Sequence, residues 1–349
     1  MDSRIDHIEI FHYKIPLSLP LTTSQDFYRS GLILFIYDKD GHLGAGEIAP
    51  LKGLSKETLN ETFKQLIAIS DFIMEKGIES IDLLKLFPSV RFGLESAFLT
   101  LKANKKGIPI WEELNPGKII KKDIKIRISA LISRHNNEAQ EMQDLVSKGY
   151  ESFKIKVKNM GDGELIKSLR QIAGNNAAII IDANKCFSFV EGVKFCRWIY
   201  PYDIKYIEDP IDDTSRLKEF FKNTGIGVAI DEDINDTEIR DGDHIRAWVI
   251  KPGIMMGLRE SISLIKTALR RNIIPVLSNP FYSGLGVSIL VILASAFIPD
   301  DIPMGLDTYR WIKKDIMEEP FTIKNGAFSL GDVLRKMGRI DKNLLQRVF

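Results

Sequence analysis

FKIKV, at residues 153–157, is the first of five short segments that read as buried strands with charge at or near the end. The other four are IIIDAN (179–184), YIEDP (206–210), VAIDED (228–233) and WVIKP (248–252). Charged groups are costly beside an apolar core unless they have partners. In a closed barrel the carboxyl ends of the strands share one mouth, where active sites lie. The pattern therefore predicts an active site at one end of a barrel.

Eight apolar runs recur along the later part of the chain. They lie near 126–132, 153–157, 178–182, 204–208, 228–231, 247–251, 273–278 and 304–307. Helical patterns separate most of them, and alternating strands and helices imply parallel pairing with right-handed crossovers. No glycine-rich phosphate loop opens these units, which argues against a nucleotide-binding fold. We predict an α/β fold with a TIM-type barrel.

The first third of the chain has a different pattern. Two strand-like stretches, within 5–17 and 30–50, indicate an antiparallel meander, and helical patterns follow over 55–76, 79–87 and 91–105. Ser55 is the predicted N-cap of the first helix. We expect an α+β capping domain over 1–120, a barrel over 121–314, and a C-terminal tail, about 315–349, that rejoins the capping domain.

Composition restricts the class of partner. The chain has 349 residues, 44% hydrophobic and 27% charged, with a net charge of +1, which favours neither nucleic acid nor a membrane surface. The longest apolar stretch, Leu285 to Ile298, has 14 residues, fewer than the ~18 that a membrane span needs. The N-terminus carries charges where a signal peptide needs an apolar run. We expect a cytoplasmic enzyme, in which Cys186 and Cys196 are reduced thiols.

Three carboxylates stand at the ends of successive strands. Asp182, Glu208 and Asp231 are 26 and 23 residues apart, one strand–helix unit each. Three carboxylates a few ångström apart cannot all stay ionised without a cation. Hard oxygen ligands suit Mg²⁺, with Mn²⁺ as a substitute. We therefore predict a metal site formed by these three side chains.

Lysines accompany the carboxylates. Lys154 and Lys156 alternate with Ile155, so both point to the same side of their strand, and Lys251 enters from the sixth strand, across the barrel. A partly desolvated lysine beside another cation has a lowered pKa and can act as a base near neutral pH. A divalent ion facing two lysine-bearing walls suits removal of a proton α to a carboxylate, because the metal stabilises the resulting enediolate.

The five strand ends together resemble the enolase superfamily, specifically its muconate-lactonizing-enzyme subgroup. The signatures of that family are K-x-K, D-A-N, E-[DE]-P, D-E and a lysine in I-K-P on strands two to six, and all five occur here in order. The resemblance covers nearly the whole chain. It implies a modified (β/α)7β barrel with an N-terminal α+β capping domain.

Within the subgroup the chain looks most like the o-succinylbenzoate synthases. GAGEIAPLKGLSKET (44–58) is similar to their cap-loop segment, and MGLDTYRW (304–311) is similar to their last strand. Dipeptide epimerases of the subgroup carry Asp-x-Asp there, whereas this chain has Asp307 followed by Thr308 and Tyr309. LSNPFYSGLG (277–286) departs from relatives that have serines and an acidic residue. The resemblance implies substrate contacts at Ser278, Asn279, Asn184 and Gly305.

The activity that this resemblance implies is the syn-dehydration of 2-succinyl-6-hydroxy-2,4-cyclohexadiene-1-carboxylate to 2-succinylbenzoate, a step of menaquinone biosynthesis. Lys156 takes and returns the proton, Lys251 faces the delocalised anion as a cation–π partner, and Lys154 holds Lys156 neutral by like-charge repulsion. Cap loops near 20–30 and 50–55 are expected to close over the succinyl tail.

Several alternatives remain open. N-acylamino acid racemases, dipeptide epimerases and muconate cycloisomerases share the metal and the lysines, so the pocket distinguishes them. A Schiff-base aldolase could use an inward lysine without a metal. A non-catalytic binding protein could retain the barrel, although none of the six charges is missing. The oligomeric state is not predicted.

Overall fold

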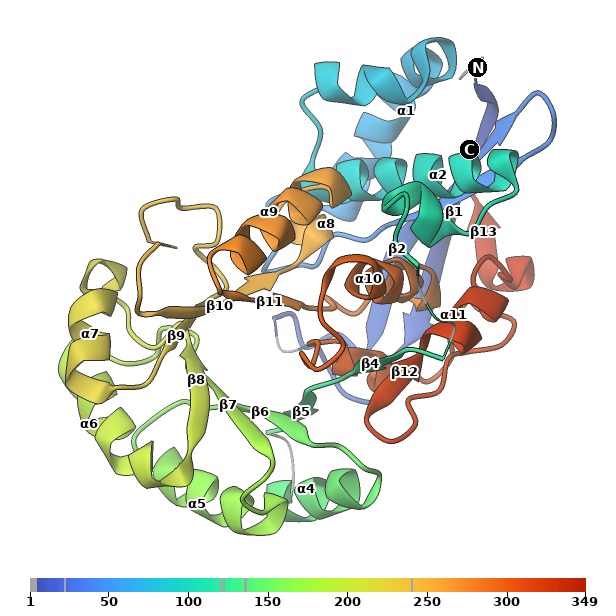
Figure 1. Cartoon of the computed structure of the whole chain (residues 1–349). Helices are drawn as coiled ribbons and strands as arrows, with labels where there is room; N and C mark the ends of the chain where they lie inside the picture. Colours follow the sequence, from blue (N-terminus) through green and yellow to red (C-terminus); the bar gives the residue numbers. More distant parts are fainter. Residues whose placement is uncertain (1–4, 22, 120, 122, 135–136, 240) are drawn as a thin grey trace.

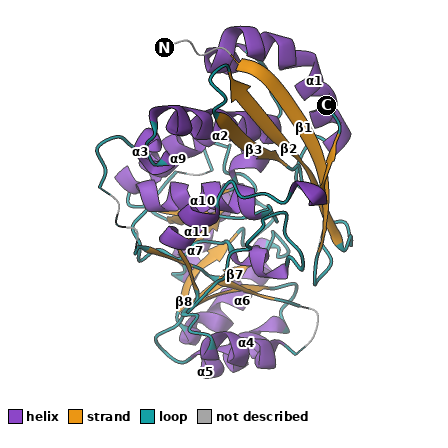
Figure 2. Cartoon of the chain, turned by 90° about the vertical axis from the view of Figure 1, so that its right-hand side faces the viewer, coloured by secondary structure: helices purple, strands orange, loops and turns teal. Residues whose placement is uncertain are grey.

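The computed structural model describes residues 5–21, 23–119, 121, 123–134, 137–239 and 241–349. The predicted domain boundary at 120/121 adjoins residues 120 and 122, which lie outside these ranges, so the boundary stays a prediction. An antiparallel sheet and a ring of parallel strands form two separate layers of the molecule (Figures 1 and 2).

The antiparallel sheet belongs to the N-terminal part of the chain. Its strand order is β13-β1-β2-β3, with bounds β1 (Ile5–Pro16), β2 (Tyr28–Asp38), β3 (Leu43–Ile48) and β13 (Leu345–Arg347). The helices α1 (Leu59–Lys76) and α2 (Pro88–Lys106) pack against it, and α3 (Ile110–Leu114) follows. The predicted meander is therefore confirmed as an α+β unit, which we call the cap.

The start of α1 corrects one prediction. Thr58, not Ser55, is the N-cap: Glu61 N donates to Thr58 Oγ1 at 3.3 Å, and Thr58 N donates to Glu61 Oε2 at 2.8 Å. Ser55 Oγ instead accepts a hydrogen bond from Leu51 N at 2.9 Å, which stabilises the preceding turn. The second predicted helix is a 3₁₀ segment, η1 (Gly77–Leu83).

Seven parallel strands form the second sheet, in chain order. They are β5 (Ala130–Ile132), β6 (Ser152–Lys156), β7 (Ala178–Asp182), β8 (Ile204–Glu208), β9 (Val228–Ile230), β10 (Ile245–Ile250) and β11 (Ile274–Leu277). Parallel bridges from Gly305 to Ser278 and from Met304 to Ile128 join the two edges. The predicted (β/α)7β barrel is thus confirmed. Residues 304–305 take the place of its eighth strand, and we call this short segment the eighth stave.

Helices cover the outside of the barrel. They are α4 (Glu138–Ser147), α5 (Asp162–Ala173), α6 (Phe189–Ile199), α7 (Leu217–Thr224), α9 (Leu258–Arg270) and α10 (Gly284–Phe297). The short helix α8 (Pro252–Met255) directly follows Lys251 and contacts α2 of the cap. In Figure 1, α4 to α7 lie along the outer side of the strands. Residues 284–296 of α10 are all buried, as predicted for a helix packed between the barrel and its neighbours. Among the described residues, no helix combines the length and the apolar character that crossing a bilayer requires.

The C-terminal tail contacts both parts of the molecule. It contains β12 (Ala327–Ser329) and α11 (Leu330–Lys336); β12 pairs with β4 (Lys125–Arg127), while β13 pairs with β1. The apolar run predicted as one strand over 126–132 is therefore two strands, of which only β5 belongs to the barrel. Short 3₁₀ helices lie at η2 (Tyr200–Tyr202), η3 (Thr214–Arg216), η4 (Asp307–Trp311) and η5 (Lys342–Leu344).

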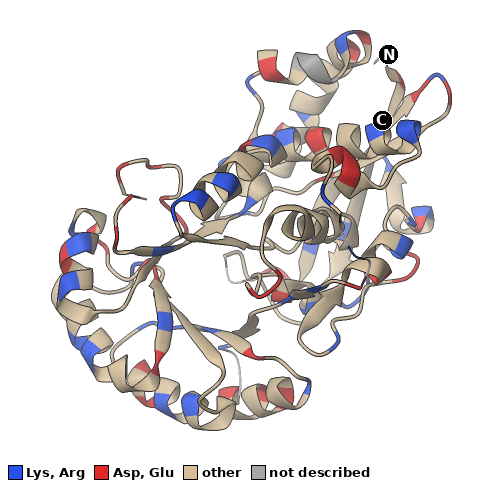
Figure 3. Ribbon diagram, in the orientation of Figure 1, with Lys and Arg blue, Asp and Glu red and all other residues tan. Residues whose placement is uncertain are grey.

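An apolar layer fills the barrel below the strand ends. It consists of Ile180, Tyr206, Ala229, Ala247 and Val276, one from each of five strands, all at most 6% exposed. Figure 3, a ribbon coloured by charge, shows that charged residues lie on the strands of the ring as well as on the outer helices. The charged strand ends therefore rest on a closed apolar floor, which keeps them at the mouth.

Candidate active site

Strand register brings the predicted site residues to one end of the barrel. Lys156 lies opposite Asp182, and Asp182 lies opposite Glu208, because β6, β7 and β8 end together. Asp231 follows the last residue of β9, and Lys251 follows the last residue of β10. The structure thus brings all three carboxylates and all three lysines together at the carboxyl ends of the strands.

Ion pairs connect the two sets of charges. Lys154 Nζ lies 2.9 Å from Asp182 Oδ2 and 2.6 Å from Glu208 Oε1. Lys251 Nζ donates to Asp231 Oδ2. Lys156 Nζ lies farther away, 3.8 Å from Asp182 Oδ2, with 32% of its side chain exposed. Two lysines are therefore tied to carboxylates, and the third reaches the open mouth.

These contacts shift the ionisation of the buried groups. Burial disfavours the charge of Lys154, but Asp182, Glu208 and Asp231 outweigh it and raise the pKa of Lys154 well above its usual value. Asp231 and Glu208 likewise raise the pKa of Lys251 against the effect of its burial. Burial favours the neutral form of Asp182, but Lys154 and Lys156 outweigh it and hold the pKa of Asp182 below its usual value.

Glu208 is the carboxylate whose ionised form this arrangement disfavours most clearly. Burial raises the pKa of Glu208 well above its usual value; Lys154 opposes this, while the Asp182 and Asp231 carboxylates add to it. Neighbouring carboxylates repel one another's charge unless a cation offsets them. The lysine contacts do this only in part for Glu208.

An unsatisfied oxygen tests whether these residues fit a metal ion. Asp231 Oδ1 is buried and has no hydrogen-bond partner in the part of the chain that the structure describes. Buried carboxylate oxygens without donors are costly, and oxygen-only donor sets suit Mg²⁺. Asp182, Glu208 and Asp231 therefore fit a hard divalent cation. In the structure the carboxylate oxygens of these three residues do not all lie within 4.8 Å of one another, because lysine ammonium groups lie between them.

A tighter acidic cluster lies elsewhere and has a different explanation. Ligand atoms of Asp38, Asp40 and His42, at the turn between β2 and β3, lie within 4.8 Å of one another. Asp38 already accepts hydrogen bonds from the backbone of Asp40 and His42 at 3.0 and 2.9 Å, and Lys105 Nζ lies 3.1 Å away. This cluster holds a turn against α2, so it is not the predicted metal site.

Sequence reasoning missed the residues that hold the carboxylates in place. Asp209 is 2% exposed and accepts hydrogen bonds from Asp231 N at 3.2 Å and Glu232 N at 3.0 Å. Lys185 Nζ reaches the same loop, 2.7 Å from Asp233 Oδ2. Asp209 follows Glu208 directly in the chain. Its backbone there has a positive φ of 41°, and this turn after the strand end directs its carboxylate to the next strand. The one feature of the sequence that could have indicated this role is that Asp209 directly follows the predicted metal ligand Glu208.

The predicted substrate contacts lie at different depths. Ser278 and Gly305 line a cavity of about 60 Å³ inside the barrel, together with Lys154 and Glu208. Asn279 lies beside it and is 3% exposed. Asn184 is exposed at the rim, where its backbone N donates to Asp182 Oδ1 at 3.2 Å. Their role as substrate contacts stays a prediction.

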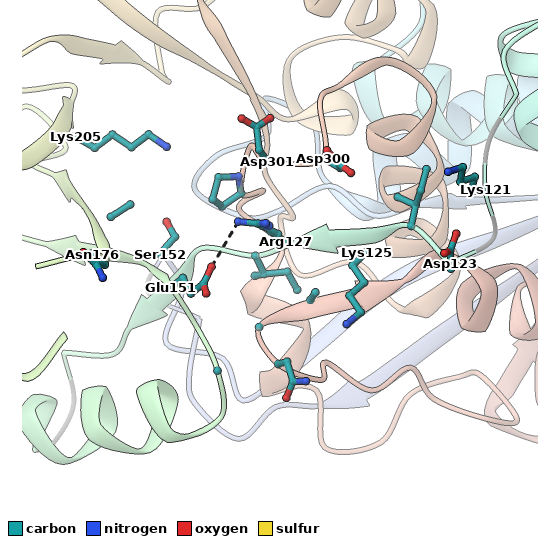
Figure 4. Close-up of a pocket in the computed structure, with 18 residues that line it drawn as sticks. Lys121, Asp123, Lys125, Arg127, Glu151, Ser152, Asn176, Lys205, Asp300 and Asp301 are labelled. Atoms are coloured by element: carbon teal, nitrogen blue, oxygen red, sulfur yellow. Dashed lines mark hydrogen bonds and ion pairs between the residues drawn. The ribbon is translucent and has the colours of Figure 1, made fainter. Parts of the chain in front are cut away.

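A larger cavity, of about 740 Å³, lies at the opposite end of the barrel. Figure 4 shows its lining, which includes Arg127, Glu151, Lys205 and Asp301. These residues stand at or near the amino ends of barrel strands or in the loop before residue 304. The lining mixes both signs of charge and contains none of the predicted site residues.

The cap-loop motif has a buried anchor. Glu47, in GAGE, is 1% exposed and accepts hydrogen bonds from Ser283 Oγ at 2.6 Å, Gly286 N at 2.8 Å and the Tyr13 hydroxyl. Ser283 is the N-cap of α10. Glu47 therefore fixes the cap to the barrel helix that follows β11.

Comparison with family models covers both parts of the chain. The model "Enolase C-terminal domain-like" matches residues 137–334, more than half of the chain. The model "MenC, N-terminal domain" matches residues 5–101. The first match contains every metal and lysine position predicted above.

Curated relatives resemble the chain over most of its length. An o-succinylbenzoate synthase of Pasteurella multocida is 27% identical, over 87% of this chain and 89% of the relative. Protein PHYLLO, chloroplastic, of Arabidopsis thaliana is also 27% identical over 93% of this chain. The chain spans only 22% of the Arabidopsis protein.

Solved structures share the fold. A dipeptide epimerase from Cytophaga hutchinsonii, complexed with Mg and a dipeptide, superposes with a TM-score of 0.83 at 19% identity, over 99% of both chains. At that identity the likeness bears on the fold alone. From the matched family model, the barrel and the order of its charged strand ends, the chain belongs to the enolase superfamily, whose enzymes generally use Mg²⁺.

Proposed function

We propose that the protein catalyses the Mg²⁺-dependent syn-dehydration of 2-succinyl-6-hydroxy-2,4-cyclohexadiene-1-carboxylate to 2-succinylbenzoate. The observation that carries the proposal is the placement of Lys156. It ends β6 in register with Asp182, yet its Nζ is 3.8 Å from the nearest oxygen of that carboxylate and its side chain is 32% exposed. Similarity to o-succinylbenzoate synthases over most of the chain supports this substrate.

Lys156 performs both proton transfers in this proposal. Its neutral amine takes the proton from the carbon that bears the ring carboxylate, and the C–H electron pair remains on the substrate. That pair then forms the new ring double bond as the C–O bond to the hydroxyl breaks. The protonated Lys156 gives its proton to the departing hydroxide, so water leaves and the ring becomes aromatic. A single base on one face suffices, as a syn-elimination requires.

The remaining charges bind and orient. Asp182, Glu208 and Asp231 would hold Mg²⁺ or Mn²⁺, which supplies positive charge for the substrate carboxylate when bound. Lys251, on the opposite wall, keeps its charge against the delocalised anion. Lys154 contributes a second fixed cation below Lys156. The apolar floor and the cap exclude water from these groups, which strengthens their electrostatic effect.

Contacts of Asp307 favour dehydration over dipeptide epimerisation. Its carboxylate accepts hydrogen bonds from Leu131 N at 2.9 Å and Tyr150 Oη at 3.1 Å, and Arg310 Nε lies 2.7 Å away. Both oxygens of this carboxylate already accept hydrogen bonds, so they are less able to bind the ammonium group of a dipeptide. N-acylamino acid racemisation, which needs no such carboxylate, is the second candidate.

The test replaces the proposed base. Lys156→Ala should lower kcat for dehydration by at least about 10³-fold, in the upper range for loss of a general acid–base group. Thermal unfolding and the rise in Tm on adding Mg²⁺ should match the wild type, because the carboxylates remain. Lys158→Ala, two residues on and exposed, is the matched control and should keep full turnover. Near-normal dehydration by Lys156→Ala would exclude Lys156 as the base.

Chelation separates the proposal from Schiff-base chemistry. Treatment with EDTA should abolish turnover, and added Mg²⁺ should restore it. Activity that survives EDTA, together with borohydride trapping of substrate on a lysine, would instead support an aldolase.

A further inference from the structure

An apolar cluster covers the carboxyl ends of the strands on the side of β10 and β11. Its cap members are Leu17, Leu21 and Leu51, and its barrel members are Ile254, Phe281 and Trp311. The barrel members follow the ends of β10, β11 and the eighth stave. We call these six residues the lid cluster. Leu131, which lines the cavity beside Lys154 and Glu208, packs against it. The lid cluster therefore borders the proposed active site.

Two buried N–H groups in or beside the lid cluster have no acceptor. Trp311 Nε1 and Asn279 Nδ2 are fully buried atoms without a hydrogen-bond partner among the described residues. Trp311 is 5% exposed and its ring packs on Phe281, with ring centroids 5.7 Å apart. A buried donor left unpaired costs about 1–3 kcal/mol, so such groups are usually kept for a ligand or a water.

Asn279 is held so that only its amide N–H₂ remains available. Its Oδ1 accepts a hydrogen bond from Tyr282 N at 2.8 Å, and its carbonyl accepts one from Thr308 Oγ1 at 2.8 Å. The second contact links the end of β11 to the segment that leads to Trp311. The two unpaired donors thus belong to adjacent, mutually fixed segments.

The charge near the lid cluster favours an anion. Arg29 is 3% exposed and its guanidinium donates to the carbonyls of Phe281, Pro50 and Ala49. Asp307 has both oxygens engaged, as described above. An ammonium group would therefore meet two N–H donors, whereas an anion could accept hydrogen bonds from both of them. The charge of Arg29, held at the carbonyl of Phe281, adds to the preference for an anion.

We propose that Trp311 Nε1 and Asn279 Nδ2, beneath the lid cluster, form a second substrate subsite that takes an acyl tail ending in a carboxylate and excludes tails that carry an ammonium group. Asn279 and Trp311 are then specificity-determining residues, separate from the metal and the lysines. The inference rests on the proposed function, since the tail belongs to a substrate whose reacting end lies at Lys156.

The experiment measures binding of the expected product and of its tail ester. Isothermal titration in the presence of Mg²⁺ gives Kd for 2-succinylbenzoate and for the derivative in which only the tail carboxylate is a methyl ester. The wild type should prefer the free acid by about tenfold, the size of one charge-assisted hydrogen bond. Trp311→Phe keeps the ring and removes only the N–H, so the preference should fall several-fold.

Asn279→Asp sharpens the test. It keeps the acceptor for Tyr282 N and replaces the free donor with a negative charge, so the preference should disappear or reverse. Trp198→Phe and Asn223→Asp, on the outer helices α6 and α7, are matched controls that should keep the wild-type ratio. In both Asn279→Asp and Trp311→Phe, KM for the diene substrate should rise more than kcat falls, because neither group touches the reacting carbon.

The outcomes separate the two proposals. If the wild type dehydrates the diene but both variants keep the tenfold preference, the subsite is excluded and the proposed function stands. If the wild type neither binds 2-succinylbenzoate nor dehydrates the diene, the proposed function fails. If the wild type binds the ester as tightly as the acid, the tail carboxylate is not recognised and the subsite is excluded directly.

Discussion

At the residue scale, Lys156 differs from its two lysine neighbours in how strongly carboxylates hold it. Lys154 contacts two carboxylates and Lys251 is bonded to Asp231, whereas Lys156 has one carboxylate at 3.8 Å. A lysine that neutralises a buried acid cannot readily give up its proton, because doing so would leave the acid unpaired. On the same strand, Lys154 is therefore held by two carboxylates, whereas Lys156, the proposed base, has one carboxylate at a longer distance.

Asp38 shows a charge that stabilises the cap instead of serving chemistry. Its burial would raise its pKa, but hydrogen bonds from His42 and Asp40 and the contact with Lys105 outweigh this and lower the pKa of Asp38 to about 2. A carboxyl whose folded pKa lies below its unfolded value stabilises the protein above the unfolded pKa, and this stabilisation is lost as pH falls. Asp38 should therefore stabilise the fold at neutral pH.

The prediction compares the stability of Asp38→Asn with that of the wild type at pH 7 and at lower pH. At pH 7 the variant should be less stable to urea by on the order of 1–2 kcal/mol, allowing for screening at a surface turn. The difference should shrink as pH falls from about 4 towards 2, the interval between the unfolded and folded pKa values. A constant difference over that range would show that the carboxylate charge is not responsible.

At the element scale, helix starts follow capping chemistry. Thr58 with Glu61 and Ser188 with Glu191 form reciprocal capping boxes at the beginnings of α1 and α6. Each box satisfies two backbone N–H groups that the helix itself cannot. The predicted start at Ser55 failed because the chain still turns there, with Ser55 bonded to Leu51.

Removal of one cap gives a measurable loss. Thr58→Ala should lower the free energy of unfolding by about 1 kcal/mol, the usual cost of losing a threonine N-cap. Thr267→Ala, inside the exposed face of α9, is the matched control and should cost nothing, since alanine is the better helix former. Urea unfolding followed by circular dichroism measures both. Equal stability of Thr58→Ala and the wild type would mean that α1 does not depend on this cap.

At the scale of the whole molecule, the cap and the barrel are joined by buried polar contacts as well as apolar ones. Glu47 of β3 reaches the start of α10, where backbone N–H groups and the helix dipole favour a negative charge. Arg29 of β2 reaches the carbonyl of Phe281. Both contacts end on residues just after β11, so the position of the cap is set beside the proposed tail subsite.

Replacement of Glu47 should weaken the contact between the cap and the start of α10. In Glu47→Gln an amide N–H₂ would face donors from Ser283 or Gly286, so a buried donor would be left unpaired. We expect a loss of on the order of 2 kcal/mol or more in the free energy of unfolding, and a higher KM as the cap shifts. Glu164→Gln, exposed on α5, should change stability by less than about 0.5 kcal/mol. Unchanged stability in Glu47→Gln would rule out this contact as an anchor.

The sequence by itself determined the barrel and the order of its charged strand ends. Strand period and spacing are local properties, and parallel strands that alternate with helices can place their carboxyl ends at only one mouth. That reasoning located Lys154, Lys156, Asp182, Glu208, Asp231 and Lys251. It also indicated the cap strands, although it placed the first helix start three residues early.

Only the tertiary structure decided which groups hold or surround that site. Glu47 and Ser283 are 236 residues apart, and Asp209 acts through the backbone of another strand. The unpaired N–H groups of Asn279 and Trp311 are visible only once every possible acceptor has been placed. Such contacts depend on where distant segments meet, which no local pattern of residues encodes. The positions of the charged groups at the mouth are therefore encoded along the strands, whereas the proposed selectivity for a substrate tail depends on packing between cap and barrel.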